Sequence, residues 1–152
     1  MKDKVRILVS QCLLGIDCRY DGGNNDCPAL VRLMDRYELI PVCPEILGGM
    51  TTPRLPSERL DGRVVNSRGE DVTADFERGA EQAVRLARLY GAKYDVLKQS
   101  SPSCGTRTVY DGSFSGKKIP GMGLTAEMLE REGIRLFDEK SVDALLSILE
   151  DE

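Results

Sequence analysis

Short apolar runs alternate along the chain with longer amphipathic stretches, which indicates strands that alternate with helices. The apolar runs are rich in Val, Ile and Leu, as is typical of strands. They predict strands at Val5–Ser10, Glu38–Val42, Tyr94–Lys98 and Ile134–Phe137. Apolar residues at helical spacing predict helices at Cys27–Tyr37, at Ala74–Tyr90, from Thr125 to Glu132, and at Val142–Glu150.

The strongest helix signal is the stretch Ala74–Tyr90. Thr73 stands where an N-cap residue is preferred, and Gly91 stands where a helix commonly ends. Thr125 and Ser141 are expected to cap the two later helices in the same way. An apolar stripe on the long helix predicts the face that packs against the core, and it consists of Phe76, Ala80, Ala83, Val84 and Ala87.

Two long segments carry turn-forming residues instead of a clear period. The first, Cys43–Val72, interleaves prolines and glycines with apolar residues, so we expect it to be ordered. The second, Gln99–Met122, has a hairpin signal around Thr108–Tyr110 and Asp111–Gly112. Loops of this length in a small domain are usually functional.

Strands that alternate with helices predict parallel pairing and an α/β fold. We expect a three-layer sandwich, with a small, mostly parallel sheet flanked by helices and long functional loops at its carboxyl edge. At this length, residues 1–152 are expected to form a single domain.

Composition and charge argue against several classes of function. The net charge of −4 and the lack of Trp give no case for a nucleic-acid partner. No apolar run approaches the ~20 residues of a membrane span, and no signal peptide is evident, so we expect a cytoplasmic protein. The chain has no histidine, which excludes His-based triads and His metal ligands. The oligomeric state is left open.

Three of the five cysteines share one place in the predicted fold. Cys12 follows the first strand, Cys43 follows the second, and Cys104 lies in the loop after the third. The carboxyl ends of parallel strands meet at one edge of a sheet, where such folds bind ligands. A single cysteine is more often a buried thiol than a ligand, but this shared position predicts that the three meet in space. Cys18 is a candidate fourth ligand or a redox-sensitive neighbour, and Cys27 is expected to pack in the core.

Three thiolates at one edge suggest a metal centre. Zinc with an open position and an iron–sulfur cluster both accept such a ligand set, and spacing does not decide between them. Glu45, two residues beyond Cys43, is the leading general base in a chain without histidine. Ser101 and Ser103, beside Cys104, are candidates to orient a substrate or relay a proton. The charged loop residues either form ion pairs that lock the loops together or bind an anionic or heterocyclic substrate, and we expect structural pairing for most of them; they are Arg19, Asp21, Arg54, Glu58 and Asp71.

Several blocks of sequence resemble a known prokaryotic family. They are VSQCLLGIDCRYDGG, PVCPEILGGMTTPRLPSE, GEDVTADFERGAEQA, LKQSSPSCGTRTVYDGSFSG and GMGLTAEMLEREGI. The family was long described as a domain of unknown function, and its characterised members are iron–sulfur-dependent thiouracil desulfidases. The resemblance implies a [4Fe-4S] cluster held by Cys12, Cys43 and Cys104. It also implies that Glu45 and Ser101 handle protons, and that a small thiolated heterocycle is the substrate.

The sequence therefore predicts a desulfidase that removes sulfur from a thiolated nucleobase such as 2-thiouracil. The expected reaction turns a thiocarbonyl into a carbonyl and releases hydrosulfide, without a change of redox state. The alternative is a non-catalytic metal-binding module, with zinc or an iron–sulfur cluster, that carries sulfur or senses redox state. A metal-free cysteine nucleophile is a third option, but no histidine is available to activate its thiol.

Overall fold

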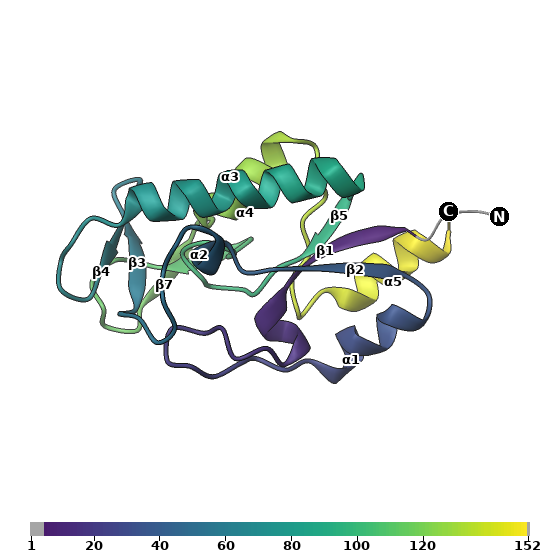
Figure 1. Cartoon of the computed structure of the whole chain (residues 1–152), viewed down its shortest axis with the longest axis horizontal. Helices are drawn as coiled ribbons and strands as arrows, with labels where there is room; N and C mark the ends of the chain where they lie inside the picture. The colour runs from purple at the N-terminus through teal and green to yellow at the C-terminus, as the bar shows by residue number, and fades with distance from the viewer. Residues whose placement is uncertain (1–4, 152) are drawn as a thin grey trace.

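A three-stranded parallel sheet forms the centre of the protein. The computed structural model describes residues 5–151 and orders the strands β2 (Glu38–Val42), β1 (Arg6–Ser10) and β5 (Tyr94–Val96). Leu8 of β1 pairs with Ile40 of β2 on one side and with Asp95 of β5 on the other. All three strands therefore end at the same edge of the sheet (Figure 1).

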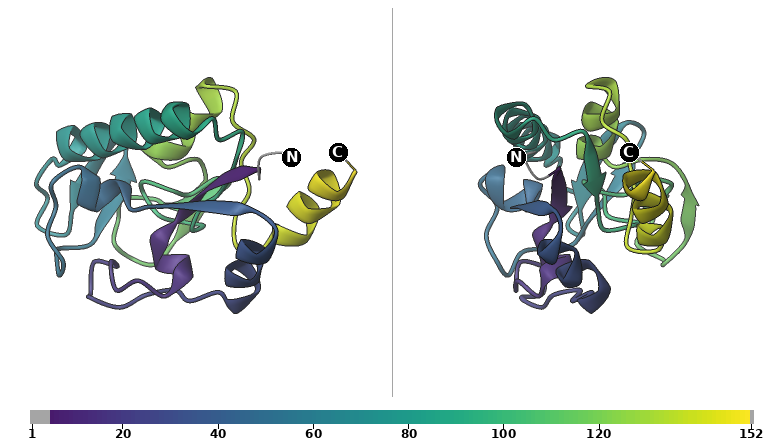
Figure 2. Two further views of the ribbon diagram at one scale, coloured as in Figure 1. Left: turned by 45° about the vertical axis from the view of Figure 1, so that its right-hand side comes forward. Right: turned by 90° about the vertical axis from the view of Figure 1, so that its right-hand side faces the viewer.

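Helices cover both faces of this sheet, which confirms the predicted α/β sandwich. On one face lie α3 (Thr73–Tyr90) and α4 (Leu124–Arg131), which bury an apolar cluster with Leu8, Ile40 and Leu97. On the other face α1 (Pro28–Val31) and α5 (Val142–Glu150) pack over Ile7, Val9 and Leu39. Figure 2 shows the sheet between the two helical layers. Every residue of the predicted apolar stripe on the long helix is buried.

The predicted fourth strand, Ile134–Phe137, runs beside β5 but is not a regular strand. It forms only isolated parallel bridges, from Tyr94 to Arg135 and from Leu97 to Asp138. Between these bridges the Asp95 carboxylate accepts the Phe137 amide N–H at 3.1 Å. A side chain thus takes the place of a backbone acceptor and interrupts the ladder.

None of the three residues that were expected to cap a helix makes a capping hydrogen bond, because their side chains have other partners. Helix α3 begins at Thr73 itself, whose hydroxyl accepts the Val64 amide N–H at 2.9 Å. Helix α4 begins at Leu124, before Thr125. Ser141 stands at the N-cap of α5, but its hydroxyl bonds to Asp138 and not to the helix.

The predicted helix at Cys27–Tyr37 is also broken into two shorter elements. Helix α1 spans only Pro28–Val31, and the 3-10 helix η2 continues over Arg32–Asp35. A second 3-10 helix, η1 (Gln11–Leu14), follows β1 directly.

The two long loop segments contain more regular structure than the sequence pattern shows. The segment after β2 is ordered as expected, and it holds helix α2 (Pro44–Leu47) and the hairpin of β3 (Ser57–Leu60) with β4 (Arg63–Asn66). The second segment forms the predicted hairpin, from β6 (Thr108–Tyr110) and β7 (Lys118–Pro120). Within the described residues, no helix is long and apolar enough to cross a membrane.

Helix α2 is held against α3 by a close contact between two glycines. A Cβ atom on Gly79 would lie 1.8 Å from the Pro44 carbonyl oxygen, and one on Gly48 would lie 2.1 Å from the Asp75 carbonyl oxygen. Both distances are far inside van der Waals contact, so only glycine permits this approach. The contact fixes the position of α2, and with it the segment that carries Cys43 and Glu45.

Replacing Gly79 with Ala is therefore expected to destabilise the protein. Ala normally favours a helix over Gly by about 1 kcal/mol, but here the added methyl group pushes α2 away and costs about 1–3 kcal/mol. Urea unfolding measures the difference, with the exposed neighbour Gln82→Ala on the same helix as the control. A Gly79→Ala variant as stable as the wild type would contradict the contact.

Asp95 makes stability depend on pH. It is fully buried, its Oδ2 has no hydrogen-bond partner among residues 5–151, and burial raises its pKa well above the usual range. The folded protein therefore holds a proton that the unfolded chain releases above about pH 3.9. Stability contributed by this proton is complete below that pH and is lost as the pH rises toward the folded-state pKa.

The variant Asp95→Asn removes this titration and keeps the oxygen that accepts the Phe137 amide. Its free energy of unfolding should rise relative to the wild type as the pH increases from 4 to about 8. Denaturant unfolding across this range measures the difference between the two proteins. A difference that stays constant with pH would show that Asp95 does not carry the proton.

Candidate functional site

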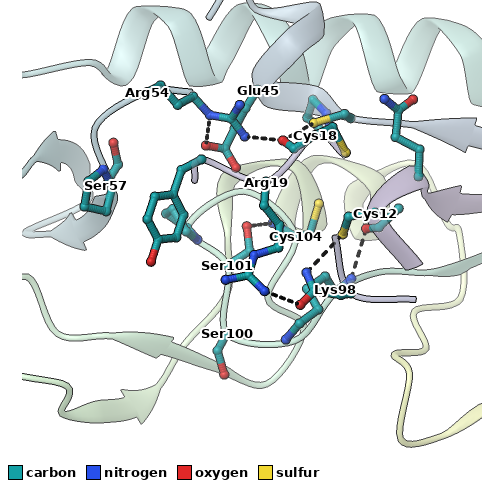
Figure 3. A pocket seen from close by; sticks show the side chains of 18 of the residues that line it. Cys12, Cys18, Arg19, Glu45, Arg54, Ser57, Lys98, Ser100, Ser101 and Cys104 are labelled. Atoms are coloured by element: carbon teal, nitrogen blue, oxygen red, sulfur yellow. Dashed lines mark hydrogen bonds and ion pairs between the residues drawn. The ribbon is translucent and has the colours of Figure 1, made fainter. Parts of the chain in front are cut away.

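A cavity of about 410 Å³ lies at the carboxyl ends of the three sheet strands. Its volume is in the range of sites for small molecules and cofactors. Its lining includes Cys12, Cys43, Cys104, Glu45 and Ser101, whereas the candidate Ser103 lies outside it. Cys12, Cys43 and Cys104 lie far apart in the sequence and line this one cavity. Figure 3 shows Cys12 and Cys104 among the side chains of its wall.

Each cysteine is placed by the element that follows its strand. Cys12 lies in η1, where its carbonyl oxygen accepts the Gly15 and Asn25 amides, and its Sγ lies 3.4 Å from Asn25 Nδ2. Cys43 is the N-cap residue of α2. Cys104 lies in the loop after β5 and is almost fully buried. The three thiols thus approach the cavity from three separate segments.

The loop that carries Cys104 is organised by the buried side chain of Gln99. Its Oε1 accepts the amide N–H groups of Ser100, Arg107 and Thr108, at 3.1 to 3.2 Å. Its Nε2 donates to Asp138 at 2.6 Å. Gln99 therefore ties both ends of the loop to the segment beside β5.

The two candidate serines have different surroundings. The Ser101 hydroxyl oxygen accepts the amides of Ser103 and Cys104, both at 3.1 Å, and its own proton remains available to the cavity that it lines. Ser103 is fully buried, and its hydroxyl bonds to that of Thr125 at 2.8 Å. Ser103 is thus a structural residue, while Ser101 faces the site.

Cys18 lies in the same cavity wall, whereas Cys27 does not. The Cys18 thiol donates toward the sulfurs of Cys12 and Cys43, and this hydrogen bonding, to Cys12 first, raises the pKa of Cys18 far above its usual range. Cys27 is the N-cap residue of α1 and packs against the core, as expected. Cys18 therefore lies next to Cys12 and Cys43 in the cavity wall.

The nominated thiols differ in their ease of ionisation. Hydrogen bonds from Cys18 and Asn25, together with the positive charge of Lys98, lower the pKa of Cys12 to about 7. The Cys18 hydrogen bond likewise lowers the pKa of Cys43. Burial raises the pKa of the Cys104 thiol. The thiolate form, which binds metal, is therefore favoured at Cys12 and Cys43 over Cys104.

Ion pairs surround the cavity. Arg54 Nε lies 3.1 Å from Glu45 Oε1, with both side chains largely buried. Lys98 pairs with Glu139 at 3.0 Å, and Arg19 with Asp21 at 2.8 Å. Structural pairing is thus confirmed for Arg19, Asp21 and Arg54, and also for Asp71, which pairs with Arg63. Glu58 instead accepts the backbone amides of Gly112 and Phe114.

The donor set suits an iron–sulfur cluster. Thiolates are the usual ligands of such clusters, and nearby hydrogen-bond donors and cations stabilise their negative charge. In residues 5–151, no three Cys, Asp or Glu side chains lie close enough together to ligate one metal ion. A zinc ion, with Zn–S bonds of about 2.3 Å, would therefore require the side chains to move. A cluster of several iron atoms can bind thiolates that lie farther apart.

Lys98 and Asn25 are among the lining residues that the reasoning from sequence missed. Lys98 lies two residues beyond the end of β5, so its place at the carboxyl edge was a usable signal. Asn25 lies in a polar loop and carries no such signal; only the folded loop brings it to the sulfur of Cys12.

Comparison with known proteins identifies the family of this chain. A family model described as 2-thiouracil desulfurase matches residues 7–141. The uncharacterised protein YbbK of Bacillus subtilis (strain 168) is 40% identical over 150 residues, which cover 92% of this chain and 99% of YbbK. A solved structure, the [4Fe-4S]-dependent thiouracil desulfidase TudS, superposes with a TM-score of 0.93 at 41% identity and covers 98% of this chain and 100% of its own. The chain belongs to the 2-thiouracil desulfurase family.

Proposed function

We propose that this protein is a [4Fe-4S]-dependent desulfidase that converts the thiocarbonyl of a thiolated pyrimidine into a carbonyl. The observation that carries the proposal is the single cavity that holds three cysteine thiols beside a carboxylate and a serine hydroxyl. Family membership and the similarity to TudS support the same activity and cofactor. The net reaction adds water, releases hydrosulfide and needs no external electron donor.

Cys12, Cys43 and Cys104 are the proposed cluster ligands. Three ligands leave one of four iron atoms without a protein thiolate, and the bound cluster would supply a soft Lewis acid suited to a thiocarbonyl sulfur. Ligand binding requires deprotonated thiols, and the Asn25 amide and the Lys98 ammonium favour this form at Cys12. The same groups help to hold the anionic centre once it is assembled.

Glu45 is the proposed general base, and Ser101 the proposed proton donor or relay. The Glu45 side chain is 18% exposed, so it faces the cavity while Arg54 holds one of its oxygens. A carboxylate within reach of the attacking water would accept its proton, an effect of about 10²–10⁴-fold on rate. Ser101 has both lone pairs engaged by backbone amides, which leaves its hydroxyl proton directed away from them.

The substrate is proposed to be a small thiolated heterocycle. The cavity wall mixes Tyr110 and Pro102 with hydroxyl and charged side chains, which suits a planar ring with polar edges. The five cysteines are all free thiols, and we propose the cytoplasm, where thiols stay reduced, as the location.

The first test is the ligand set. Separate Ala substitutions at Cys12, Cys43 and Cys104 should each abolish the cluster, so that anaerobically reconstituted protein falls from about four irons per chain to near zero. Iron and sulfide analysis, together with visible absorption, measures the loss.

Cys18→Ala and Cys27→Ala serve as matched controls. Cys18 shares the cavity and Cys27 does not, yet neither is a proposed ligand, so both variants should keep about four irons per chain. Loss of the cluster in Cys18→Ala, with retention in one of the three ligand variants, would overturn the proposed assignment.

The second test separates an enzyme from a metal-carrying module. Glu45→Gln should keep the cluster and reduce hydrosulfide release from 2-thiouracil by about 10²–10⁴-fold, because the amide cannot accept the proton. Iron analysis and a hydrosulfide assay on the same anaerobic sample give both readings. Unchanged turnover would remove Glu45 from the mechanism, and a wild-type protein that holds four irons but releases no hydrosulfide would favour the carrier or sensor alternative.

A further inference from the structure

We infer that Arg54 is a positioning residue that aligns the Glu45 carboxylate with the cavity and locks it to the loop that carries Cys18. This inference rests on the proposed function of the site. Arg54 lines the cavity, yet only 5% of its side chain is exposed, and the charge is held inside the protein by several fixed partners.

The guanidinium group of Arg54 reaches four acceptors from three separate segments. Its Nε donates to Glu45 Oε1 at 3.1 Å, and one Nη donates to the Cys18 carbonyl oxygen at 2.8 Å. The other Nη donates to the Thr51 carbonyl oxygen and the Thr52 hydroxyl, both at 3.1 Å. Figure 3 shows the guanidinium between the Glu45 carboxylate and the Cys18 carbonyl.

The carboxylate of Glu45 has this one anchor. No other hydrogen-bond partner for it occurs among residues 5–151, so Arg54 holds Oε1 and leaves Oε2 for the cavity. Helix α2 itself is fixed against α3 through Gly48 and Gly79. The fixed backbone of α2 and the hydrogen bond from Arg54 thus together set the direction of Glu45 Oε2.

The same guanidinium also fixes the loop on the other side of the cavity. Besides the bond to the Cys18 carbonyl, the Arg54 backbone amide donates to the Tyr20 carbonyl oxygen at 2.8 Å. This loop returns to Asn25, whose side chain contacts the Cys12 sulfur. Arg54 therefore couples the proposed base to the loop that carries Cys18 and Asn25.

The planar fork of an arginine is required for this role. Its five N–H donors point in fixed directions, and four of them are used here on acceptors that surround the group. A lysine carries the same charge but presents a single nitrogen on a flexible stem. Lysine would therefore keep attraction to Glu45 without fixing its direction.

The test compares Arg54→Gln and Arg54→Lys with the wild type in anaerobically reconstituted protein. Both variants should retain the cluster, and the kcat for hydrosulfide release from 2-thiouracil should fall about 10- to 100-fold in Arg54→Gln. The KM should change far less, because four N–H donors of Arg54 are already taken by acceptors of the protein. Arg54→Lys should recover only part of the kcat.

A double-variant cycle shows whether Arg54 acts through Glu45. In a Glu45→Gln background, Arg54→Gln should cause little further loss, since groups that work as a unit are not additive. The matched control is Arg59→Gln, because Arg59 is also largely buried and bonds to the Met122 and Gly62 carbonyls, but lies outside the cavity wall. Its kcat should equal that of the wild type.

Two outcomes overturn the inference: an unchanged kcat in Arg54→Gln, or a full additional loss in the Glu45→Gln background. If the wild type holds four irons and releases no hydrosulfide, the proposed function fails separately. Crystal structures of the wild type and Arg54→Gln then decide the inference. A displaced Glu45 carboxylate in the variant supports it, and an unmoved carboxylate overturns it.

Discussion

The site depends on the parallel pairing of β1 with β2 and with β5. This register brings the ends of three strands to one edge, and the residues that follow them are Cys12, Cys43 and the loop that leads to Cys104. Antiparallel pairing of any one strand would send its cysteine to the opposite edge. The hydrophobic clusters on the two faces maintain the register, because a slip by one residue would turn the side chains of each cluster to the opposite face of the sheet.

The packing around the sheet also orients the chemistry. The glycine contact between α2 and α3 fixes the position of the Glu45 backbone. The side-chain amide of Gln99 holds the loop of Cys104 through hydrogen bonds to its backbone. Arg54 links α2 to the loop of Cys18. These three contacts consist of buried hydrogen bonds or a close approach of two backbones. They hold the side chains of the cavity in place before any ligand binds, as preorganised catalysis requires.

The sequence was sufficient to predict the fold class and the presence of Cys12, Cys43 and Cys104 at one sheet edge, because hydrophobic period and strand order determine where strands end. It did not predict features that arise from tertiary contacts. Asp95 interrupts the fourth strand through a hydrogen bond made across the sheet, and Thr73 bonds to Val64 instead of capping its helix. The hairpin β3–β4 had a readable signal in Asp61-Gly62, both with positive φ, which is typical of a two-residue hairpin turn. The anchor role of Arg54 had no such signal, since its four acceptors lie in three segments.

The central claim is that Cys12, Cys43 and Cys104 together hold one iron–sulfur cluster. Diffraction from crystals grown without oxygen, with data collected at the iron absorption edge, tests it most directly. We predict anomalous density for one compact cluster in the cavity, bonded to these three sulfurs and to no other cysteine. Iron bonded to Cys18 in place of one of them, or a reconstituted protein with no iron in this cavity, would contradict the account.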